Sequence, residues 1–191
     1  MASTKPGERK LQILQALAAM LENPKSEKIT TAALAARVSV SEAALYRHFA
    51  SKAQMFEGLI DFIETSVFGL INQISEQQDD GVLQTQAIVH MLLNFAERNP
   101  GMTRVLIGDV LVNEDERLQL RMNQFAERLE LALRQSLRMA AAQGHSVETE
   151  ASVRAAMLCS FVYGRWLRFA KTGFKQLPTE HATAQMAMLL R

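Results

Sequence analysis

The sequence predicts an all-α protein with a small helical head and a larger helical body. Of its 191 residues, 48% are hydrophobic and only 6% are aromatic. Apolar residues recur at spacings of three and four, which is the periodicity of helices with one buried face. The interruptions carry Gly, Pro, Asn or Asp, residues that typically end helices. We therefore expect about nine to ten helices in one or two domains.

The first predicted helix covers residues 8–22, and two short helices follow within residues 30–49. Ala35 lies where these two helices would cross, and its small side chain permits close approach. Either Ser39 or Ser41 can cap the second helix, since a serine oxygen accepts from free backbone N–H groups. The apolar residues that can form a shared core on both sides of the turn are Leu34, Val38, Val40, Leu45 and Phe49. These features predict a helix-turn-helix.

The second of these helices has a surface suited to the major groove of DNA. Its alanines let the backbone approach the bases, its glutamate can accept from cytosine, and its arginine can bridge guanine acceptors or a phosphate. Two threonines, Tyr46 and Lys52 are placed to hold phosphates. The predicted DNA-binding residues are Thr30, Thr31, Ser41, Glu42, Ala43, Ala44, Tyr46, Arg47, His48 and Lys52. The alternative is a helical hairpin that binds only proteins and leaves these residues solvated.

Charge is distributed unevenly along a chain whose net charge is only +1. Residues 1–56 hold eight of the 21 Lys and Arg but only four of the 20 acidic residues, so this part carries +4 and the remainder −3. A basic head on an acidic body fits a protein that meets phosphates at one end. Charge alone leaves open a chance imbalance on a solvated face.

Residues 8–68 resemble the amino-terminal DNA-binding domain of the TetR family of regulators. The segments that carry the resemblance are Ile29-Thr-Thr, Ala35, Val40-Ser41, Leu45-Tyr-Arg-His-Phe49 and Ser51-Lys52. The resemblance implies a TetR-like fold, with a DNA-binding domain over residues 7–67 and a dimerising, partner-binding helical domain over residues 68–191.

Two positions depart from the family pattern. Ser39 stands at a turn position that is commonly Gly, which removes easy access to positive φ, so a different turn or some strain is expected. Ala50 stands where Pro is common, so the start of the following helix depends on Ser51 as its cap.

The body is predicted to be helical over residues 51–75, 82–98, 101–112, 114–142, 147–172 and 179–190. The residue pattern of the amphipathic stretch 114–141 is compatible with a coiled coil, but a helix in a globular bundle is the preferred interpretation. Within it, Glu130 and Arg134 have the spacing of a supportive ion pair.

The TetR family pairs two copies through the last two long helices. The resemblance therefore implies a homodimer, in which two recognition helices read an inverted repeat. The matching positions are Ala156, Cys159, Ser160, Tyr163, Gly164, Leu167, Met186 and Leu189. Their small residues permit close helix approach, although they could equally face the core of one protomer.

Residues 41–49, 59–64, 97–101 and 117–124 further resemble the nucleoid occlusion members of the family. In those proteins the DNA-bound dimer inhibits ring assembly by the tubulin-like division protein FtsZ. The resemblance implies a nucleoid-associated protein that binds palindromic chromosomal DNA and FtsZ. The matching partner-binding positions are Phe62, Met91, Asn94, Arg98 and Asn99. Phe62 is equally well explained as core, and Leu70 departs from the pattern, because such proteins can carry a basic residue there.

Other functions have weaker support. A repressor whose body holds a small apolar molecule is the main alternative, since ten methionines and Trp166 could line a pocket. An enzyme is disfavoured, because the four histidines have no metal-ligand spacing and no phosphate loop or nucleophile elbow occurs. Cys159 lies in an apolar helical run, where an inert thiol is expected. We expect no metal or cofactor.

The amino-terminal residues give a further expectation about location. Residues 1–7 lack the apolar core of a secretory signal, and no uncharged apolar run is long enough to cross a bilayer. The chain is therefore expected to be soluble and cytoplasmic.

Overall fold

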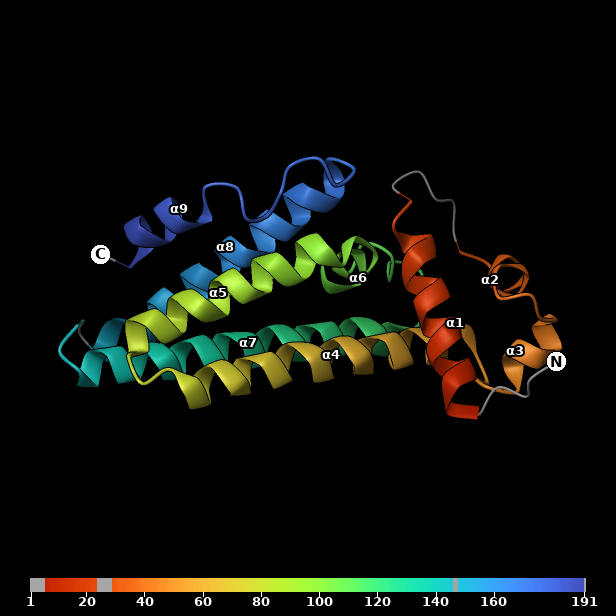
Figure 1. The fold of residues 1–191 in the computed structure, drawn as a ribbon, viewed down its shortest axis with the longest axis horizontal. Helices are drawn as coiled ribbons and strands as arrows, with labels where there is room; N and C mark the ends of the chain where they lie inside the picture. The colour runs from red at the N-terminus through yellow and green to blue at the C-terminus, as the bar shows by residue number, and fades with distance from the viewer. Residues whose placement is uncertain (1–5, 24–28, 146–147, 191) are drawn as a thin grey trace.

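The computed structural model describes residues 6–23, 29–145 and 148–190, and every regular element within them is helical (Figure 1). In chain order these elements are α1 (Pro6–Leu21), α2 (Thr31–Arg37), α3 (Glu42–Tyr46), α4 (Lys52–Gln77), α5 (Gly81–Arg98), α6 (Pro100–Leu106), α7 (Glu116–Ala142), the 3₁₀ turn η1 (Glu148–Glu150), α8 (Ala151–Lys171) and α9 (Ala182–Leu189). The expected all-α fold is confirmed.

Three of the body helices are shorter than the sequence predicts. α6 ends at Leu106 and is followed by turns that include positive φ at Gly108 and Asn113, a conformation that interrupts a helix. α9 begins only after His181, which also has positive φ. The predicted helix start at residue 147 lies outside the described residues, and α8 itself begins at Ala151.

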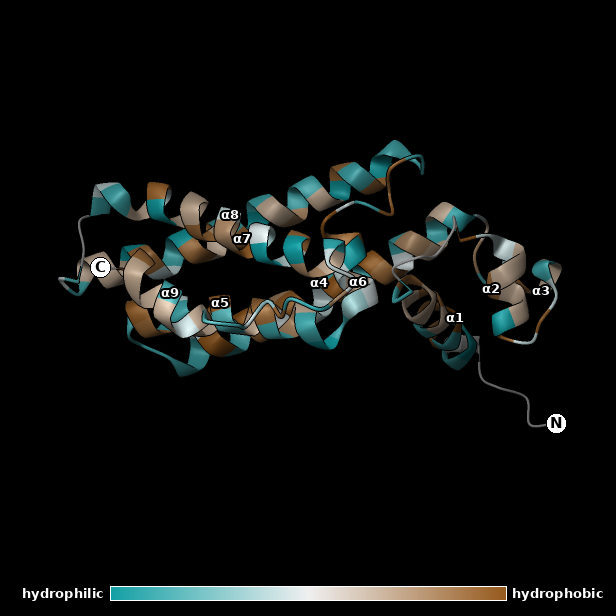
Figure 2. Cartoon of the chain, turned by 90° about the horizontal axis from the view of Figure 1, so that it is seen from above, coloured by the Kyte–Doolittle hydropathy of each residue, from teal (hydrophilic) through white to brown (hydrophobic). Residues whose placement is uncertain are grey.

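The head and the body share the long helix α4. Helices α1, α2 and α3 lie at one end of the molecule, and α4 runs from them along the bundle of α5, α7 and α8 (Figure 1). α7 packs against α8, α5 and α4, so it belongs to the globular bundle. Hydrophilic and hydrophobic segments alternate along the long helices, as helices with one buried face require (Figure 2).

Core packing continues from the head into the body. One cluster of buried residues includes Leu45 in the head, Phe56 and Ile63 along α4, and Phe125 and Trp166 in the body. The expected domain boundary between residues 67 and 68 therefore falls inside a continuous helix, α4.

α6 forms the second connection between head and body. A Cβ atom on Gly101 would lie 2.0 Å from the carbonyl oxygen of Ala18, so only glycine allows α6 to approach α1 this closely. Arg104 Nη1 lies 3.4 Å from the carbonyl oxygens of Leu21 and Asn23 and donates to both at the end of α1. The head is thus tied directly to the segment that follows α5.

Candidate nucleic-acid interface and partner surfaces

Side-chain caps define the helix-turn-helix. Thr30 Oγ1 accepts from Ala33 N at 3.1 Å and begins α2, while Ser41 Oγ accepts from Ala44 N at 3.2 Å and begins α3. Ser39 is the turn residue and has φ of 54°. Of the two serines considered as caps, Ser41 is therefore the cap and Ser39 has the conformation that usually favours glycine.

The predicted core of the motif is mostly confirmed. Leu34, Ala35, Leu45 and Phe49 are buried, and the backbone N–H of Val40 donates to Ala35 O at 3.0 Å across the turn. The cap expected at Ser51 is also present, since its hydroxyl accepts from Gln54 N at 3.1 Å. The helices of the head are therefore positioned largely by local hydrogen bonds over a small core.

Most of the predicted DNA-binding residues lie on the accessible surface of the head. Thr30, Ser41, Glu42, Ala43, Tyr46 and Arg47 are exposed, whereas Thr31, Ala44, His48 and Lys52 are partly buried. Thr31 Oγ1 donates to Glu42 Oε2 at 2.7 Å and so links the starts of α2 and α3. The carboxylate of Glu42 is therefore partly engaged within the protein, and Ser41 has its oxygen committed to the cap.

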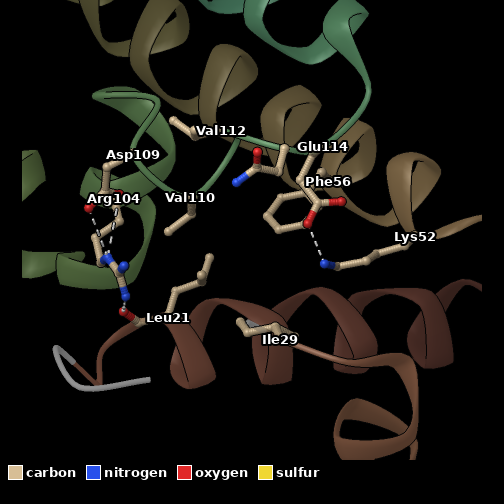
Figure 3. A pocket seen from close by; sticks show the side chains of 10 residues that line it. Leu21, Ile29, Lys52, Phe56, Arg104, Asp109, Val110, Val112 and Glu114 are labelled. Atoms are coloured by element: carbon tan, nitrogen blue, oxygen red, sulfur yellow. Dashed lines mark hydrogen bonds and ion pairs between the residues drawn. The ribbon is translucent and has the colours of Figure 1, made fainter. Parts of the chain in front are cut away.

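Lys52 differs from the other predicted DNA-binding residues, because its ammonium group points into the junction between head and body. It pairs with Glu114 and lies 5.6 Å from the centre of the Phe56 ring. Lys52 and Glu114 both line a cavity of about 220 Å³ (Figure 3). Arg104 and Asp109, which form another ion pair, line the same cavity. Sequence reasoning missed Glu114, since no local pattern connects two residues 62 positions apart.

The predicted partner-binding residues lie on α4, on α5 and at the start of α6. Phe62 is 43% exposed, so it is not a core residue. Met91, Asn94 and Arg98 follow a spacing of three and four along one face of α5, with Met91 partly buried and the other two exposed. Asn99 caps the junction of α5 and α6, and its Nδ2 donates to Phe95 O at 2.7 Å.

The predicted dimer residues separate into two groups. Ser160, Gly164 and Leu167 are exposed on α8, and Ala156, Tyr163 and Leu189 are partly buried. Cys159 and Met186 are only 8% and 1% exposed, because they face the protomer's own core. For these two side chains the structure favours the alternative that the sequence left open, a position in the core of one protomer.

The exposed face of α8 contains two residues that sequence reasoning missed. Val153 is 72% exposed and Met157 is 40% exposed. Together they complete a stripe at alternating spacings of four and three, which we call the α8 stripe: Val153, Met157, Ser160, Gly164 and Leu167. This spacing is the sequence signal that could have identified it.

The chemistry of Cys159 and Tyr163 fits a structural role. Burial, assisted by the nearby negative charge of Glu130, raises the pKa of the Cys159 thiol to about 11, so the thiol stays protonated near neutral pH. Burial also raises the pKa of Tyr163. The expected ion pair of Glu130 with Arg134 is not found among the described residues, and Arg134 Nε has no hydrogen-bond partner there.

The described part of the chain gives little support to a metal site or to a pocket for an apolar ligand. No group of three His, Cys, Asp or Glu within it could hold a metal ion. Trp166 is fully buried and donates to Leu92 O at 3.1 Å, so it is a core residue. Cavities of about 220 and 270 Å³ lie elsewhere, and neither is lined by Trp166 or by a methionine. None of the described helices combines the length and apolar character needed to cross a membrane.

Both parts of the chain match models of known families. Residues 13–59 match the family described as "Bacterial regulatory proteins, tetR family". Residues 79–191 match the SlmA-like family described as "Tetracyclin repressor-like, C-terminal domain". Among solved structures, a TetR transcription regulator from Haloarcula marismortui has the same fold, with a TM-score of 0.82 over 96% of this chain and 97% of that chain, at 16% identity.

Full-length relatives narrow this assignment. The nucleoid occlusion factor SlmA of Vibrio cholerae is 49% identical over 99% of this chain and 97% of its own length. The nucleoid occlusion factor SlmA of Alteromonas mediterranea is 47% identical over 98% of this chain and 96% of its own length. The chain therefore belongs to the TetR family of DNA-binding, non-enzymatic regulators and, within that family, to the SlmA-type nucleoid occlusion factors.

Proposed function

We propose that two copies of this chain bind an inverted-repeat DNA site on the chromosome and that the DNA-bound dimer antagonises FtsZ ring assembly over the nucleoid. The protein would then act in the cytoplasm, in association with the nucleoid. The observation that carries the proposal is the likeness over nearly the whole chain to nucleoid occlusion factors, which includes both the head and the body. The exposed surface of α3 supports the DNA-binding part.

The α8 stripe supports the dimer. It combines exposed apolar residues with Ser160 and Gly164, and nothing lies within 4 Å of a Cβ placed on Gly164, so a second helix can approach closely. One α3 helix of five residues can contact only a few bases, whereas a two-fold pair reads both halves of a palindrome. We infer that the α8 stripe of one copy packs against that of the other.

Phe62 and the exposed face of α5 support the FtsZ contact. Phe62 is an exposed aromatic residue on α4, and Asn94 and Arg98 are exposed polar residues on α5. Exposed aromatic and polar residues of these kinds are typical of binding hot spots and their polar rims. The apolar-ligand repressor has no comparable support, because Trp166 is committed to the core.

The decisive experiment measures FtsZ polymers by sedimentation with GTP, in the presence of the full chain. A palindromic duplex, enriched from random DNA by the wild-type chain, is added or replaced by a scrambled duplex. We expect fewer polymers only when the chain and the enriched duplex are both present. If the duplex binds but polymers are unchanged, while an apolar metabolite releases the DNA, the chain is a repressor instead.

The dimer is tested separately by Ser160→Arg, which places a charged, bulky side chain in the middle of the α8 stripe. Sedimentation should show a monomer, and binding to the palindrome should be lost. The matched control is Gln124→Arg, which adds the same side chain to an exposed position of α7. A Ser160→Arg protein that remains dimeric and binds DNA normally would exclude this face as the interface.

A further inference from the structure

The ion pair of Lys52 with Glu114 restricts a cation at the start of α4 that is a candidate phosphate contact. Their side chains are only 22% and 13% exposed, so both charges are substantially withdrawn from water. Lys52 also lies above the Phe56 ring, which stabilises its position further. In Figure 3 the Lys52 side chain extends along the cavity toward Glu114, in the gap between head and body.

Other ion pairs already hold α4 beside α7. Arg117 Nε lies 2.8 Å from Glu57 Oε1, and Arg121 Nη2 lies 2.8 Å from Glu64 Oε2. In these pairs α4 supplies the carboxylate and α7 the arginine, whereas α4 supplies the cation to Glu114. The arrangement of α4 and α7 therefore does not depend on Glu114, and removing its charge should leave the bundle intact.

A DNA phosphate and the Glu114 carboxylate would compete for the same ammonium group. Contact with a phosphate requires Lys52 to leave Glu114, and the partly buried carboxylate then loses its partner. We propose that Glu114 is a positioning residue that withholds Lys52 from DNA phosphates and so lowers the affinity of the free protein for DNA of any sequence. This inference rests on the proposed DNA-binding function and concerns the regulation of that site.

The proposal predicts that Glu114→Gln binds DNA more tightly than the wild type. We expect about fivefold tighter binding once Lys52 is released, which corresponds to about 1 kcal/mol of binding free energy. Fluorescence anisotropy would measure this with the full chain, on a random-sequence duplex and on the enriched palindrome. Because a phosphate contact carries no sequence information, the gain should be similar on both.

A double-mutant cycle separates release of Lys52 from simple loss of negative charge. Lys52→Met keeps most of the side chain over Phe56 but removes its charge. Glu114→Gln should tighten binding in the wild-type background and have no effect in the Lys52→Met background. Equal gains in both backgrounds would contradict the proposal, because Glu114 would then act only by repelling DNA.

Two further measurements exclude a merely structural effect. Glu114→Gln should steepen the dependence of log affinity on log salt by up to about 0.9 per protomer, as one more phosphate contact requires. Glu116→Gln removes the same charge from an exposed position of α7 and should leave the slope unchanged. An unaltered slope in Glu114→Gln would overturn the proposal, whereas a wild-type chain that binds no DNA would overturn the proposed function itself.

Discussion

The recognition helix α3 has five residues, whereas α5 and α8 in the body have 18 and 21. The surface of α3 depends on one cap at Ser41 and on a small core around Leu45. The surfaces of α5 and α8 are the outer faces of helices whose inner faces are buried in the bundle. The proposed DNA-binding surface therefore follows from local sequence, while the proposed partner-binding surfaces follow from what the core leaves exposed.

The connection between the two regions should be the most sensitive to mutation. Gly101→Ala places a methyl group 2.0 Å from the backbone oxygen of Ala18, so α1 and α6 must separate. We expect the free energy of unfolding to fall by about 3 kcal/mol, at the upper end of the cost of overpacking, and DNA binding to weaken. Urea unfolding and DNA anisotropy would measure the two effects.

Gly69→Ala is the matched control for that change. Nothing lies within 4 Å of its Cβ position on α4, so alanine should stabilise the helix by about 0.5–1 kcal/mol. If both alanine variants were equally stable, the close approach of α6 to α1 would be unimportant for the fold.

In the head, Arg47→Ala should change which DNA sequences the protein prefers. Arg47 is exposed beside α3, and an arginine that bridges guanine acceptors contributes about 2 kcal/mol of discrimination for each half-site. Competition binding against duplexes with single base changes would measure this preference. Arg37→Ala removes the same charge at the end of α2 and should weaken binding to all duplexes alike. An equal loss across sequences for both variants would contradict base readout by Arg47.

On the body, Phe62→Ala should weaken the effect on FtsZ by about tenfold, since an exposed aromatic residue is the typical anchor of a binding surface. DNA affinity and thermal stability should stay close to wild type, because the side chain is 43% exposed. Leu120→Ala removes an apolar side chain that is 54% exposed on α7 and serves as the control. Unchanged FtsZ sedimentation with Phe62→Ala would exclude this position from the contact.

The accuracy of the sequence predictions follows the same division between head and body. The cap at Ser51 could be predicted, and the cap of α3 could be narrowed to Ser39 or Ser41, since such bonds join residues only three positions apart. The burial of Leu45 could be predicted from the apolar pattern of the motif. The sequence left open whether Cys159 and Met186 face a partner or the core of one protomer. Both side chains are buried in the protomer, and this burial depends on how α7 and α5 pack around them. Periodicity shows that a helix has two faces but does not show which neighbours cover them.

The same limit applies to charged residues. Glu130 and Arg134 had the right spacing along one helix, yet their ion pair is not found among the described residues. Lys52 instead pairs with Glu114, 62 residues away and on the other side of the junction. Such a contact requires the complete fold, so the candidate phosphate contact could be predicted from sequence but its internal competitor could not.

The smallest expected effect concerns the turn of the head. Ser39 has φ of 54°, a conformation that costs a residue with a Cβ atom roughly 1 kcal/mol or more. Ser39→Gly should therefore raise the free energy of unfolding, but only by about 0.5–1 kcal/mol, because glycine also loses more chain entropy on folding. Thermal unfolding and hydrogen exchange at the Leu45 amide would detect the change. Ser39→Ala keeps the strain and should give no gain. If glycine instead reduced protection at Leu45, the Ser39 side chain would contribute contacts that outweigh its backbone strain, and the head would depend on more than its local caps.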